Sequence, residues 1–261
     1  MFFYILIGDT IRLVDMKRVL IIGATSGIGL ELAKLYVEKG YIVGVAGRRE
    51  DRLQALKLKY PQLYTGCIDI TISSAPQLIQ KLIAAMDGMD IFIQCAGVGY
   101  QNPDLEPSLE LRTVQTNCLG FMQSVLTAYH YFSENKRKGQ LVIISSIAGT
   151  KGLGIAPAYS ATKRMQNIYI DALEQQSRIE NKNICFTDVK PGFIETELLN
   201  TEKHSYPLIM PLDVASKKIF RVIEKKKRRP VIDWKFAILV FFWKLIPAWL
   251  WKQLPIKAKS K

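Results

Sequence analysis

The chain has 261 residues, of which 49% are hydrophobic and 23% charged, and its formal net charge is +13. This length accommodates one large domain or two small ones, with a hydrophobic core that needs no disulfide or metal to stabilise it. Ordinary contents of 17 glycines and 11 prolines exclude collagen-like and low-complexity chains. The four cysteines are widely spaced and there are only two histidines, so we predict a reducing compartment, no disulfide framework and no metal site.

The charge is concentrated at the C-terminal end. Residues 217–261 hold 14 Lys and Arg against 2 acidic residues, which gives +12, and the preceding 216 residues hold 22 against 21, which gives +1. This asymmetry indicates nucleic acid or an anionic membrane surface as a partner, the alternative being a solvated basic tail. A solvated tail is not favoured, because the basic residues flank a very apolar stretch.

The N-terminal run from Met1 to Ile7 is apolar, but no basic region precedes it and Gly8-Asp9 ends it. It is too short to span a bilayer and does not have the form of a signal peptide. We therefore predict that residues 1–15 are an N-terminal extension, or that they reflect a start site upstream of the true one.

From Arg18 onward, short β-rich runs alternate with longer helical patterns. Most of the β-rich runs are continuously apolar, as expected for parallel strands covered on both faces. We expect strands at Val19–Ile22, Ile42–Ala46, Leu63–Ile68, Ile91–Gln94, Leu141–Ile144 and Ile184–Val189. We expect helices at Gly29–Lys39, Arg49–Lys59, Pro76–Met86, Leu109–Phe132 and Ala158–Ile179. The alternation predicts an α/β domain over residues 16–232, a Rossmann-like, doubly wound parallel β-sheet with helices on both faces.

After Val189 the pattern changes. Lys190-Pro191-Gly192 breaks the strand, and a long segment without clear periodicity reaches Pro211. Such a segment is typical of a lid or binding loop. A further helix is expected at Asp213–Glu224 and a short strand at Pro230–Ile232.

A glycine-rich turn, Gly23-Ala24-Thr25-Ser26-Gly27-Ile28-Gly29, joins the first expected strand to the first helix. Glycines let the backbone approach a pyrophosphate, and the helix N-terminus behind them offers free N–H groups to the anion. Tight turns between a strand and a helix often carry glycine for other reasons. Its place in the chain nevertheless favours a dinucleotide site.

Two adjacent arginines, Arg48 and Arg49, follow the second expected strand. A site for NAD(H) usually has a carboxylate here, which would repel a 2′-phosphate. Two guanidiniums suit phosphate instead, so the sequence favours NADP(H) over NAD(H), the alternative being surface charges at a helix start. Asp69, just past the third strand, is a candidate acceptor for the adenine amine or a turn cap.

Tyr159 and Lys163 are four residues apart in an expected helix and therefore share one face. A free phenol has a pKa of ~10, and a neighbouring cation lowers it, which would make Tyr159 a working acid and base. The spacing alone is common, and a core tyrosine above a surface lysine is the alternative.

Three further features accompany this pair. Ser145 and Ser146 close the fifth expected strand, Gln94-Cys95-Ala96-Gly97 ends the fourth, and Asn117 lies in the following helix. With the glycine loop and the Tyr-x-x-x-Lys motif, these residues make the stretch from Lys17 to Asp213 resemble the short-chain dehydrogenase/reductase family in its single-domain form. Ser146, thirteen residues before Tyr159, matches the family's catalytic serine.

The resemblance implies hydride transfer between a nicotinamide and a carbonyl or alcohol carbon, with Tyr159 as the proton donor or acceptor. The implied catalytic residues are Asn117, Ser146, Tyr159 and Lys163. Together with the arguments above, it gives the cofactor-binding residues as Gly23, Thr25, Ser26, Gly27, Ile28, Gly29, Arg48, Arg49, Asp69, Ala96, Gly97, Tyr159, Lys163, Pro191, Gly192 and Thr196. The family also implies a homodimer or homotetramer through the two long helices.

One departure concerns Gln94-Cys95, which stands where the family usually has two asparagines. The change puts the local hydrogen bonding between the central strands in doubt, without affecting the catalytic set. Cys95 and Cys118 are interpreted as small buried residues rather than thiolate nucleophiles.

The C-terminal tail, residues 233–261, contains all four tryptophans. Lys244 and Pro247 divide its apolar stretch into runs that are too short to span a bilayer. Tryptophans and flanking lysines are typical of a membrane interface, so we predict an interface-lying anchor. The alternatives are packing over the substrate cleft and a subunit interface. Nucleic-acid binding is not predicted, because the aromatic residues cluster on a hydrophobic segment.

These features predict a cytoplasmic enzyme that is peripheral at an anionic membrane surface and uses NADP(H) on a lipophilic ketone or alcohol. A hypothesis from another class is a catalytically silent, membrane-tethered NADP(H)-binding sensor or scaffold. The intact set of Asn117, Ser146, Tyr159 and Lys163 argues against the second hypothesis.

Overall fold

A computed structural model describes residues 3–7, 10–14, 16–135, 138–199, 204–205, 208–255 and 259–260. Parts of the predicted N-terminal extension and of the basic C-terminal end therefore lie outside the described residues. Residues 200–203 and 206–207, in the predicted lid segment, lie outside them as well.

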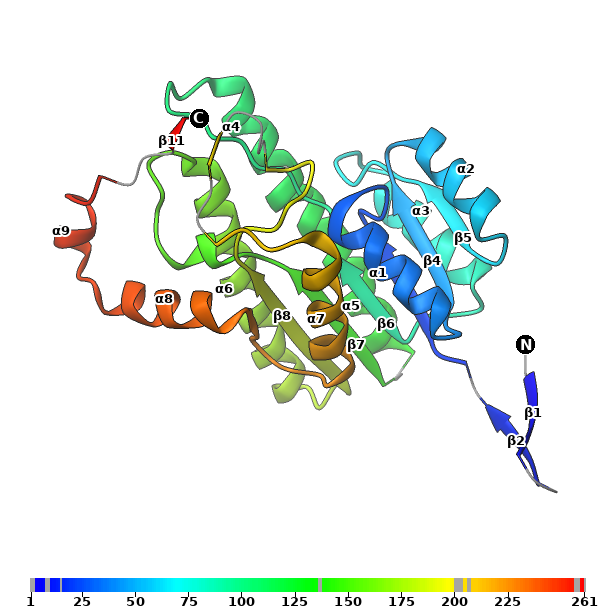
Figure 1. The fold of residues 1–261 in the computed structure, drawn as a ribbon. Helices are drawn as coiled ribbons and strands as arrows, with labels where there is room; N and C mark the ends of the chain where they lie inside the picture. Colours follow the sequence, from blue (N-terminus) through cyan, green and yellow to red (C-terminus); the bar gives the residue numbers. More distant parts are fainter. Residues whose placement is uncertain are drawn as a thin grey trace.

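Seven parallel strands form the central sheet in the order β10-β8-β7-β6-β3-β4-β5 (Figure 1). They are β3 (Arg18–Ile22), β4 (Ile42–Gly47), β5 (Tyr64–Cys67), β6 (Ile91–Gln94), β7 (Gly139–Ile144), β8 (Ile184–Pro191) and β10 (Val231–Ile232). From β3 the chain first builds β4 and β5 on one side and then crosses to β6 on the other. In open α/β sheets, ligands bind in a crevice outside the carboxyl ends of the strands at such a reversal, which here lies at β3 and β6.

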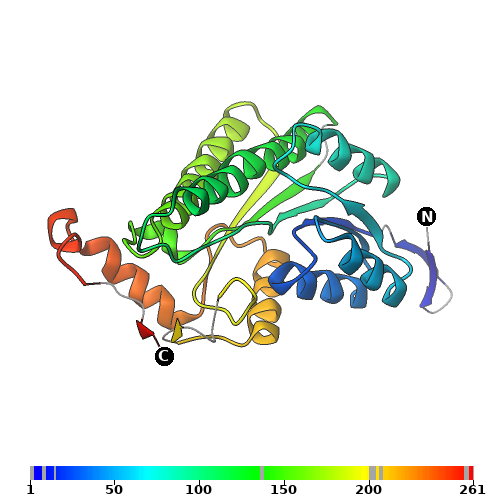
Figure 2. The same ribbon diagram turned by 90° about the horizontal axis from the view of Figure 1, so that it is seen from above.

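Helices cover both faces of the sheet, as Figure 2 shows from above. One face carries α1 (Gly27–Glu38), α2 (Glu50–Lys59) and α7 (Leu212–Glu224), and the other carries α3 (Ala75–Ala85), α5 (Phe121–Glu134) and α6 (Pro157–Ile179). Successive residues of β3 point to opposite faces, so Val19 and Ile21 enter one core while Leu20 and Ile22 enter the other. The predicted doubly wound fold is confirmed.

The long helix predicted at Leu109–Phe132 is interrupted. It consists of α4 (Pro107–Val114), a π-helical turn η1 (Gln115–Gly120) and α5. The other predicted helices and strands of the domain are present with ends that differ by a few residues. A short 3₁₀ turn, η2 (Ile147–Thr150), follows β7.

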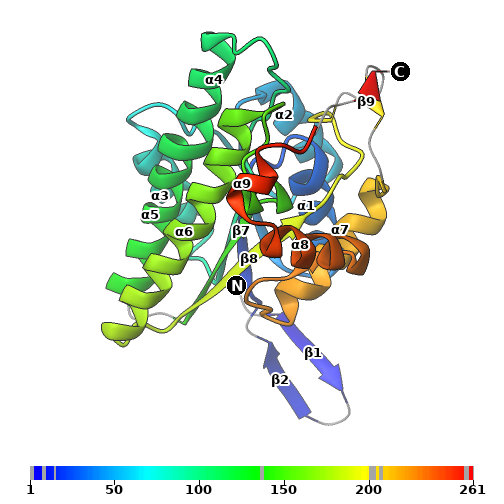
Figure 3. The ribbon, with the colours of Figure 1, turned by 90° about the vertical axis from the view of Figure 1, so that its left-hand side faces the viewer.

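The C-terminal segment forms a helix, α8 (Trp234–Leu245), and one further turn, α9 (Ala248–Trp251). Figure 3 views the molecule from the end where they lie. Phe236 and Val240 are buried against Ile147 of η2, so one side of α8 belongs to a small core. The predicted boundary between residues 232 and 233 therefore marks a change of composition within a packed unit.

Two antiparallel pairs complete the described chain. β1 (Phe3–Ile7) pairs with β2 (Thr10–Val14), and this hairpin projects from the end of the molecule opposite α8 (Figure 1). β11 (Lys259–Ser260) pairs with β9 (His204–Ser205), which brings the C-terminal end beside the segment that follows β8.

Candidate active site

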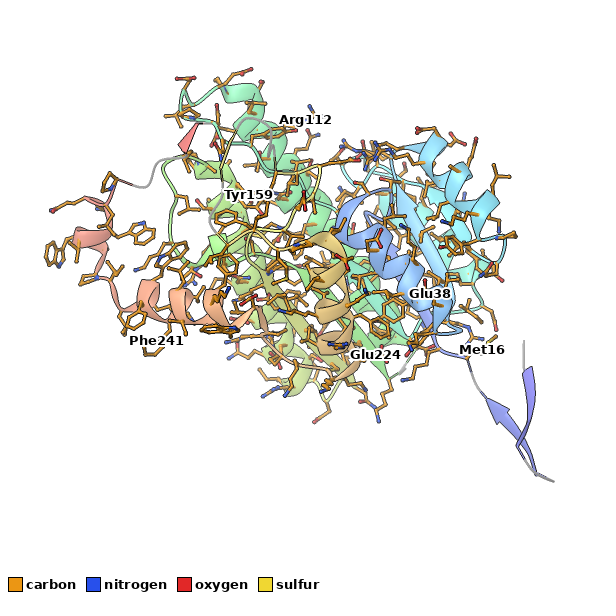
Figure 4. All side chains as sticks on the ribbon, viewed as in Figure 1. Met16, Glu38, Arg112, Tyr159, Glu224 and Phe241 are labelled. Carbon is orange, nitrogen blue, oxygen red and sulfur yellow. The ribbon has the colours of Figure 1, made fainter. Side chains whose placement is uncertain are left out.

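The four predicted catalytic residues come together at the carboxyl ends of β6 and β7. Asn117 lies in the π-helical turn, Ser146 follows β7, and Tyr159 and Lys163 lie in the first turns of α6. Figure 4 marks Tyr159 at this edge of the sheet. The loop after β7, the π-helical turn η1 and the helix α6 thus contribute to one site, although its outermost members are 46 residues apart in the chain.

Tyr159 lies between the backbone of Gly99 and the Ser146 hydroxyl. A side chain at Gly99 would come within 2.7 Å of the Tyr159 ring, so glycine is needed for the ring to lie there. Burial raises the pKa of the Tyr159 phenol, and its hydrogen bond with Ser146 acts in the opposite direction. The Ser146 hydroxyl also accepts the Ala148 N–H at 3.1 Å, which fixes its orientation.

The Lys163 ammonium lies 5.8 Å from the centre of the Tyr159 ring, on the face that the helical spacing predicts. It donates to the Ile144 carbonyl and to Gln166 Oε1, both at 3.1 Å. The lowered Tyr159 pKa that the sequence suggests is not found. Burial dominates the pKa of the phenol, and it also lowers the pKa of Lys163 to about 8, so the cation is itself weakened.

Asn117 is fully buried and positioned by its neighbours from both sides. Its side-chain amide donates to the Val98 carbonyl at 2.7 Å and accepts the Val98 N–H at 2.9 Å. The backbone carbonyl of Asn117 accepts Gln166 Nε2 at 2.9 Å. Gln166 therefore connects Asn117 to Lys163. The π-helical turn frees and re-aims backbone groups here, as such turns often do at functional sites.

A buried carboxylate, Asp188, lies beneath the site in the middle of β8. It accepts the Ser145 hydroxyl and the Asn167 amide, and Lys190 Nζ lies 3.3 Å from it. Its negative charge favours the protonated form of Lys163. Sequence reasoning missed Asp188, Gln166 and Asn167. An acidic residue inside a largely apolar strand was the available signal for Asp188, because a buried charge needs partners.

The predicted glycine loop has the required backbone geometry. Gly23 and Gly27 have φ angles of +90° and +54°, and a side chain at Gly23 would collide with the backbone of Ala96. Among the described residues, no side chain caps the N-terminus of α1, so the N–H groups of its first turn have no side-chain acceptor from this part of the chain. The loop can therefore hold an anionic group in the way the sequence suggests.

The two arginines after β4 diverge. Arg48 lies 3.7 Å from Asp69, whose carboxylate also accepts the N–H and hydroxyl of Thr71. Asp69 thus forms the turn cap of the second alternative. Arg49 instead turns back to the glycine loop, where it donates to the Thr25 hydroxyl at 3.0 Å and to the Ser26 hydroxyl.

A third arginine, which sequence reasoning missed, joins Arg49. Arg52 follows it by three residues on α2, and both guanidiniums bind the carboxylate of Glu197, at 2.6 Å from Arg52 and 2.8 Å from Arg49. These hydrogen bonds hold the pKa of Glu197 below its usual value. The spacing of Arg49 and Arg52 could have indicated a shared helix face, but nothing in the sequence pointed to Glu197.

Of the predicted cofactor-binding residues, Pro191 ends β8, and Gly192 and Thr196 follow it. Thr196 packs over the glycine loop, 3.5 Å from the position that a Gly27 side chain would take. Gly192 lies against the ring of Phe236, so a side chain at residue 192 would collide with that ring. The C-terminal helix α8 therefore contacts the turn Pro191–Gly192 directly.

The Gln94-Cys95 pair leaves one hydrogen-bonding atom unused. Gln94 Nε2 donates to the Ala96 carbonyl at 3.4 Å, while Gln94 Oε1 is buried without a partner among the described residues. Burial raises the pKa of the Cys95 thiol to about 12 and also raises that of Cys118. Neither cysteine has the pKa of a nucleophile.

The described residues contain neither a metal-binding cluster nor a membrane-spanning helix. No group of three or more His, Cys, Asp or Glu residues is placed to hold a metal ion within the described ranges. Over the same part of the chain, no helix combines the length and hydropathy that a membrane crossing requires.

Comparison with known proteins places the chain in a family. Residues 17–207 match the family described as short chain dehydrogenase. An uncharacterised oxidoreductase of Mycobacterium tuberculosis is 30% identical over 250 residues, which cover 90% of this chain and 96% of that protein. The match of residues 17–207 excludes α8 and α9.

Solved structures share the fold at low sequence identity. ElxO with NADP bound has a TM-score of 0.75 and 20% identity, covering 85% of this chain and 99% of its own. A short chain dehydrogenase/reductase from Burkholderia phymatum in complex with NAD has a TM-score of 0.76 and 15% identity, covering 87% and 92%. The chain belongs to the short-chain dehydrogenase family and is an oxidoreductase that acts on alcohol or carbonyl groups.

Proposed function

We propose that the protein is an NADP(H)-dependent oxidoreductase that interconverts a lipophilic ketone and its alcohol at a membrane surface. The observation that carries the proposal is the group of Tyr159, Ser146 and Lys163, in which a phenol, a hydroxyl and a buried ammonium converge. A phenol and a hydroxyl that are hydrogen-bonded to each other lie close enough for both to contact one carbonyl oxygen.

A nicotinamide cofactor held by the glycine loop and by Gly192 and Thr196 would supply a hydride to the carbonyl carbon, or accept it in the reverse direction. Tyr159 donates its phenolic proton to the oxygen as negative charge develops there. Ser146 holds the same oxygen by a hydrogen bond, which also acts against the rise that burial causes in the pKa of the phenol. We propose that the Lys163 ammonium, 5.8 Å from the centre of the Tyr159 ring, offsets a further part of the effect of burial. Gln166, which is itself bound to the Asn117 carbonyl, accepts a hydrogen bond from Lys163 and helps to keep the ammonium in place.

Three arginines support NADP(H) over NAD(H). Arg49 and Arg52 already hold one anion, the Glu197 carboxylate, beside the Thr25 and Ser26 hydroxyls, and Arg48 lies nearby on the same turn. A ribose 2′-phosphate is a stronger anion than a carboxylate and suits the same fork of donors. The expected result is a lower dissociation constant for NADPH than for NADH, measured by quenching of protein fluorescence.

The C-terminal helix supports a lipophilic substrate and a membrane partner. Its inner side covers Gly192 and Ile147 next to the site, while Trp234 and Phe241 are 68% and 60% exposed. Phe241 projects from α8 away from the domain (Figure 4). Further exposed residues of the same segment are Ile238, Phe242, Leu245, Trp249, Leu250 and Leu254, with Lys235, Lys244 and Lys252 among them.

An aromatic helix with lysines suits the headgroup region of an anionic bilayer on the cytoplasmic side. Co-sedimentation with phosphatidylcholine vesicles, with and without phosphatidylserine, tests this. We expect binding that requires phosphatidylserine and is lost when Phe241 and Phe242 are both replaced by serine. Leu58→Ser, at an exposed position of α2, is the matched control and should leave binding unchanged.

Exposed apolar side chains on α4, η1 and α6 support a homodimer or homotetramer. Leu111, Val114 and Leu119 are exposed on the first two, and Ile168 is exposed on α6, which packs against α4. Light scattering coupled to size-exclusion chromatography would give the assembly state directly. A monomer at micromolar concentration would contradict this part of the proposal.

The experiment that tests the activity is an NADPH-oxidation screen with ketones of graded chain length, with and without anionic vesicles. We expect the catalytic efficiency to rise with chain length and with vesicles. Tight NADPH binding without turnover of any ketone or alcohol would instead favour the sensor or scaffold hypothesis.

A further inference from the structure

Glu197 occupies the place where the proposed cofactor's 2′-phosphate is expected. The three donors of the Arg49 guanidinium are divided between two kinds of partner. Nε and Nη2 bind the Thr25 and Ser26 hydroxyls of the glycine loop, and Nη1 binds Glu197. The second guanidinium, Arg52, binds the other oxygen of the same carboxylate and also reaches the Thr25 carbonyl at 3.4 Å.

The carboxylate belongs to a segment far away in the chain. Glu197 is 148 residues from Arg49 and 145 from Arg52, and it follows Thr196, which packs over Gly27. Its ion pairs therefore join the segment after β8 to the glycine loop and the start of α2. All three side chains are partly exposed, at 39% for Arg49, 41% for Arg52 and 56% for Glu197, so a soluble anion can reach them.

From these contacts we infer that Glu197 is a specificity-determining residue that competes with the ribose 2′-phosphate for Arg49 and Arg52. The inference rests on the proposed use of NADP(H). A phosphate dianion must displace the carboxylate to gain both guanidiniums, whereas NAD(H) carries only a neutral 2′-hydroxyl there, which has no charge to compete for the arginines and leaves the ion pairs intact. Glu197 therefore weakens the binding of NADP(H) but not that of NAD(H), and it reduces the preference for NADP(H) that the arginines create.

Glu197 can compete with the 2′-phosphate for the arginines because its carboxylate remains charged. The two arginines hold the pKa of Glu197 below its usual value, so it is ionised throughout the neutral range. Removing its charge while keeping its shape leaves both arginines free for the phosphate. Because exposed ion pairs are individually weak, two of them correspond to roughly a three- to tenfold change in affinity.

The test compares Glu197→Gln with Glu195→Gln in the full chain. Glu195 is exposed in the same segment and forms no ion pair with another described residue, so it is the matched control. Dissociation constants are measured at fixed ionic strength for NADPH, NADH, 2′-AMP and 5′-AMP. We expect Glu197→Gln to bind NADPH and 2′-AMP about three- to tenfold more tightly than the wild type. NADH and 5′-AMP should be unchanged, and Glu195→Gln should change none of the four.

Three results would overturn the inference. Equal tightening for NADPH and NADH would mean that Glu197 only obstructs the crevice. Weaker NADPH binding would mean that it orients the arginines, and no change would mean that it does not compete. The proposed function fails separately, if the wild type binds NADPH no more tightly than NADH. In that case the ratio of 2′-AMP to 5′-AMP affinity in Glu197→Gln still decides the role of Glu197.

Discussion

Different interactions position the residues at the two ends of the crevice: buried hydrogen bonds at one end and exposed ion pairs at the other. At the Tyr159 end, Asn117, Ser146 and Lys163 are buried on elements of the sheet and helix layers, and hydrogen bonds fix each of them. At the Arg49 end, partly exposed guanidiniums bind a carboxylate from a distant segment. Buried hydrogen bonds set a geometry that changes little, whereas exposed ion pairs exchange partners at small cost. We therefore expect substitutions at the first end to change chemistry and those at the second end to change cofactor choice.

The largest effect is expected from removing the Tyr159 hydroxyl. Tyr159→Phe takes away the proton donor but keeps the ring on Gly99, and general acid catalysis contributes on the order of 10²–10⁴ in rate. Turnover should fall by that amount while the NADPH dissociation constant changes less than about twofold. Steady-state kinetics and fluorescence titration measure the two quantities. Retained turnover would remove Tyr159 from its proposed role.

The next effect tests whether α8 belongs to the buried end. Phe236 is almost fully buried in contact with Gly192, whereas Phe241, on the same helix, is exposed. Phe236→Ala should lower the free energy of unfolding by about 3 kcal/mol, in the range for buried phenylalanines. Phe241→Ala should change it by less than about 0.5 kcal/mol, as for surface positions. Urea denaturation measures both changes. Equal losses in the free energy of unfolding for the two variants would contradict the packing of α8.

The exposed end is tested through Arg49. Replacing it with glutamine removes a charged donor from the site proposed for the 2′-phosphate, and such bonds are worth about 1.5–3 kcal/mol. NADPH affinity should fall at least tenfold and NADH affinity should stay within about twofold. Competition titration with both cofactors measures this. A parallel loss for NADH would show that Arg49 supports the loop rather than the phosphate.

The smallest effect concerns Lys163 and pH. Burial lowers its pKa to about 8, so between pH 8 and its usual pKa of ~10.4 the unfolded chain binds more protons than the native state. The free energy of unfolding should therefore rise with pH across this window, by about 1 kcal/mol per unit. Lys163→Met lacks this titration, so the difference between the two proteins isolates it. Thermal unfolding at pH 8 and pH 10 measures that difference, and equal slopes would contradict the buried ammonium.

The fold was predictable from the sequence because its signals are local. Continuous apolar runs such as Val19–Ile22 are typical of strands covered on both faces. The glycine loop and the Tyr159–Lys163 spacing are likewise motifs of residues that are close together in the chain. Interactions across the chain had no such signal. Gln166, which connects Asn117 to Lys163, and Glu197, which binds Arg49, are reached only through the tertiary fold.

The C-terminal helix shows a different limit. Its sequence is apolar on nearly all sides, so periodicity could not indicate that Phe236 and Val240 face inward while Phe241 faces out. The π-helical turn at Asn117 was also beyond prediction, since helix propensities do not distinguish it from the α-helices on either side. Asp188 did carry a usable signal, as an acidic residue within a largely apolar strand, and so did the spacing of Arg49 and Arg52.

The contact between Gly192 and Phe236 ties two distant positions into one constraint. A side chain at residue 192 has no room while the Phe236 ring is present, so the turn after β8 and the first turn of α8 cannot vary independently. A methyl group added at one position becomes tolerable only when the ring at the other is made smaller. The effects of substitutions at Gly192 and Phe236 on the free energy of unfolding are therefore non-additive. The residue at position 236 of the C-terminal helix thus limits which residues the turn can carry at position 192.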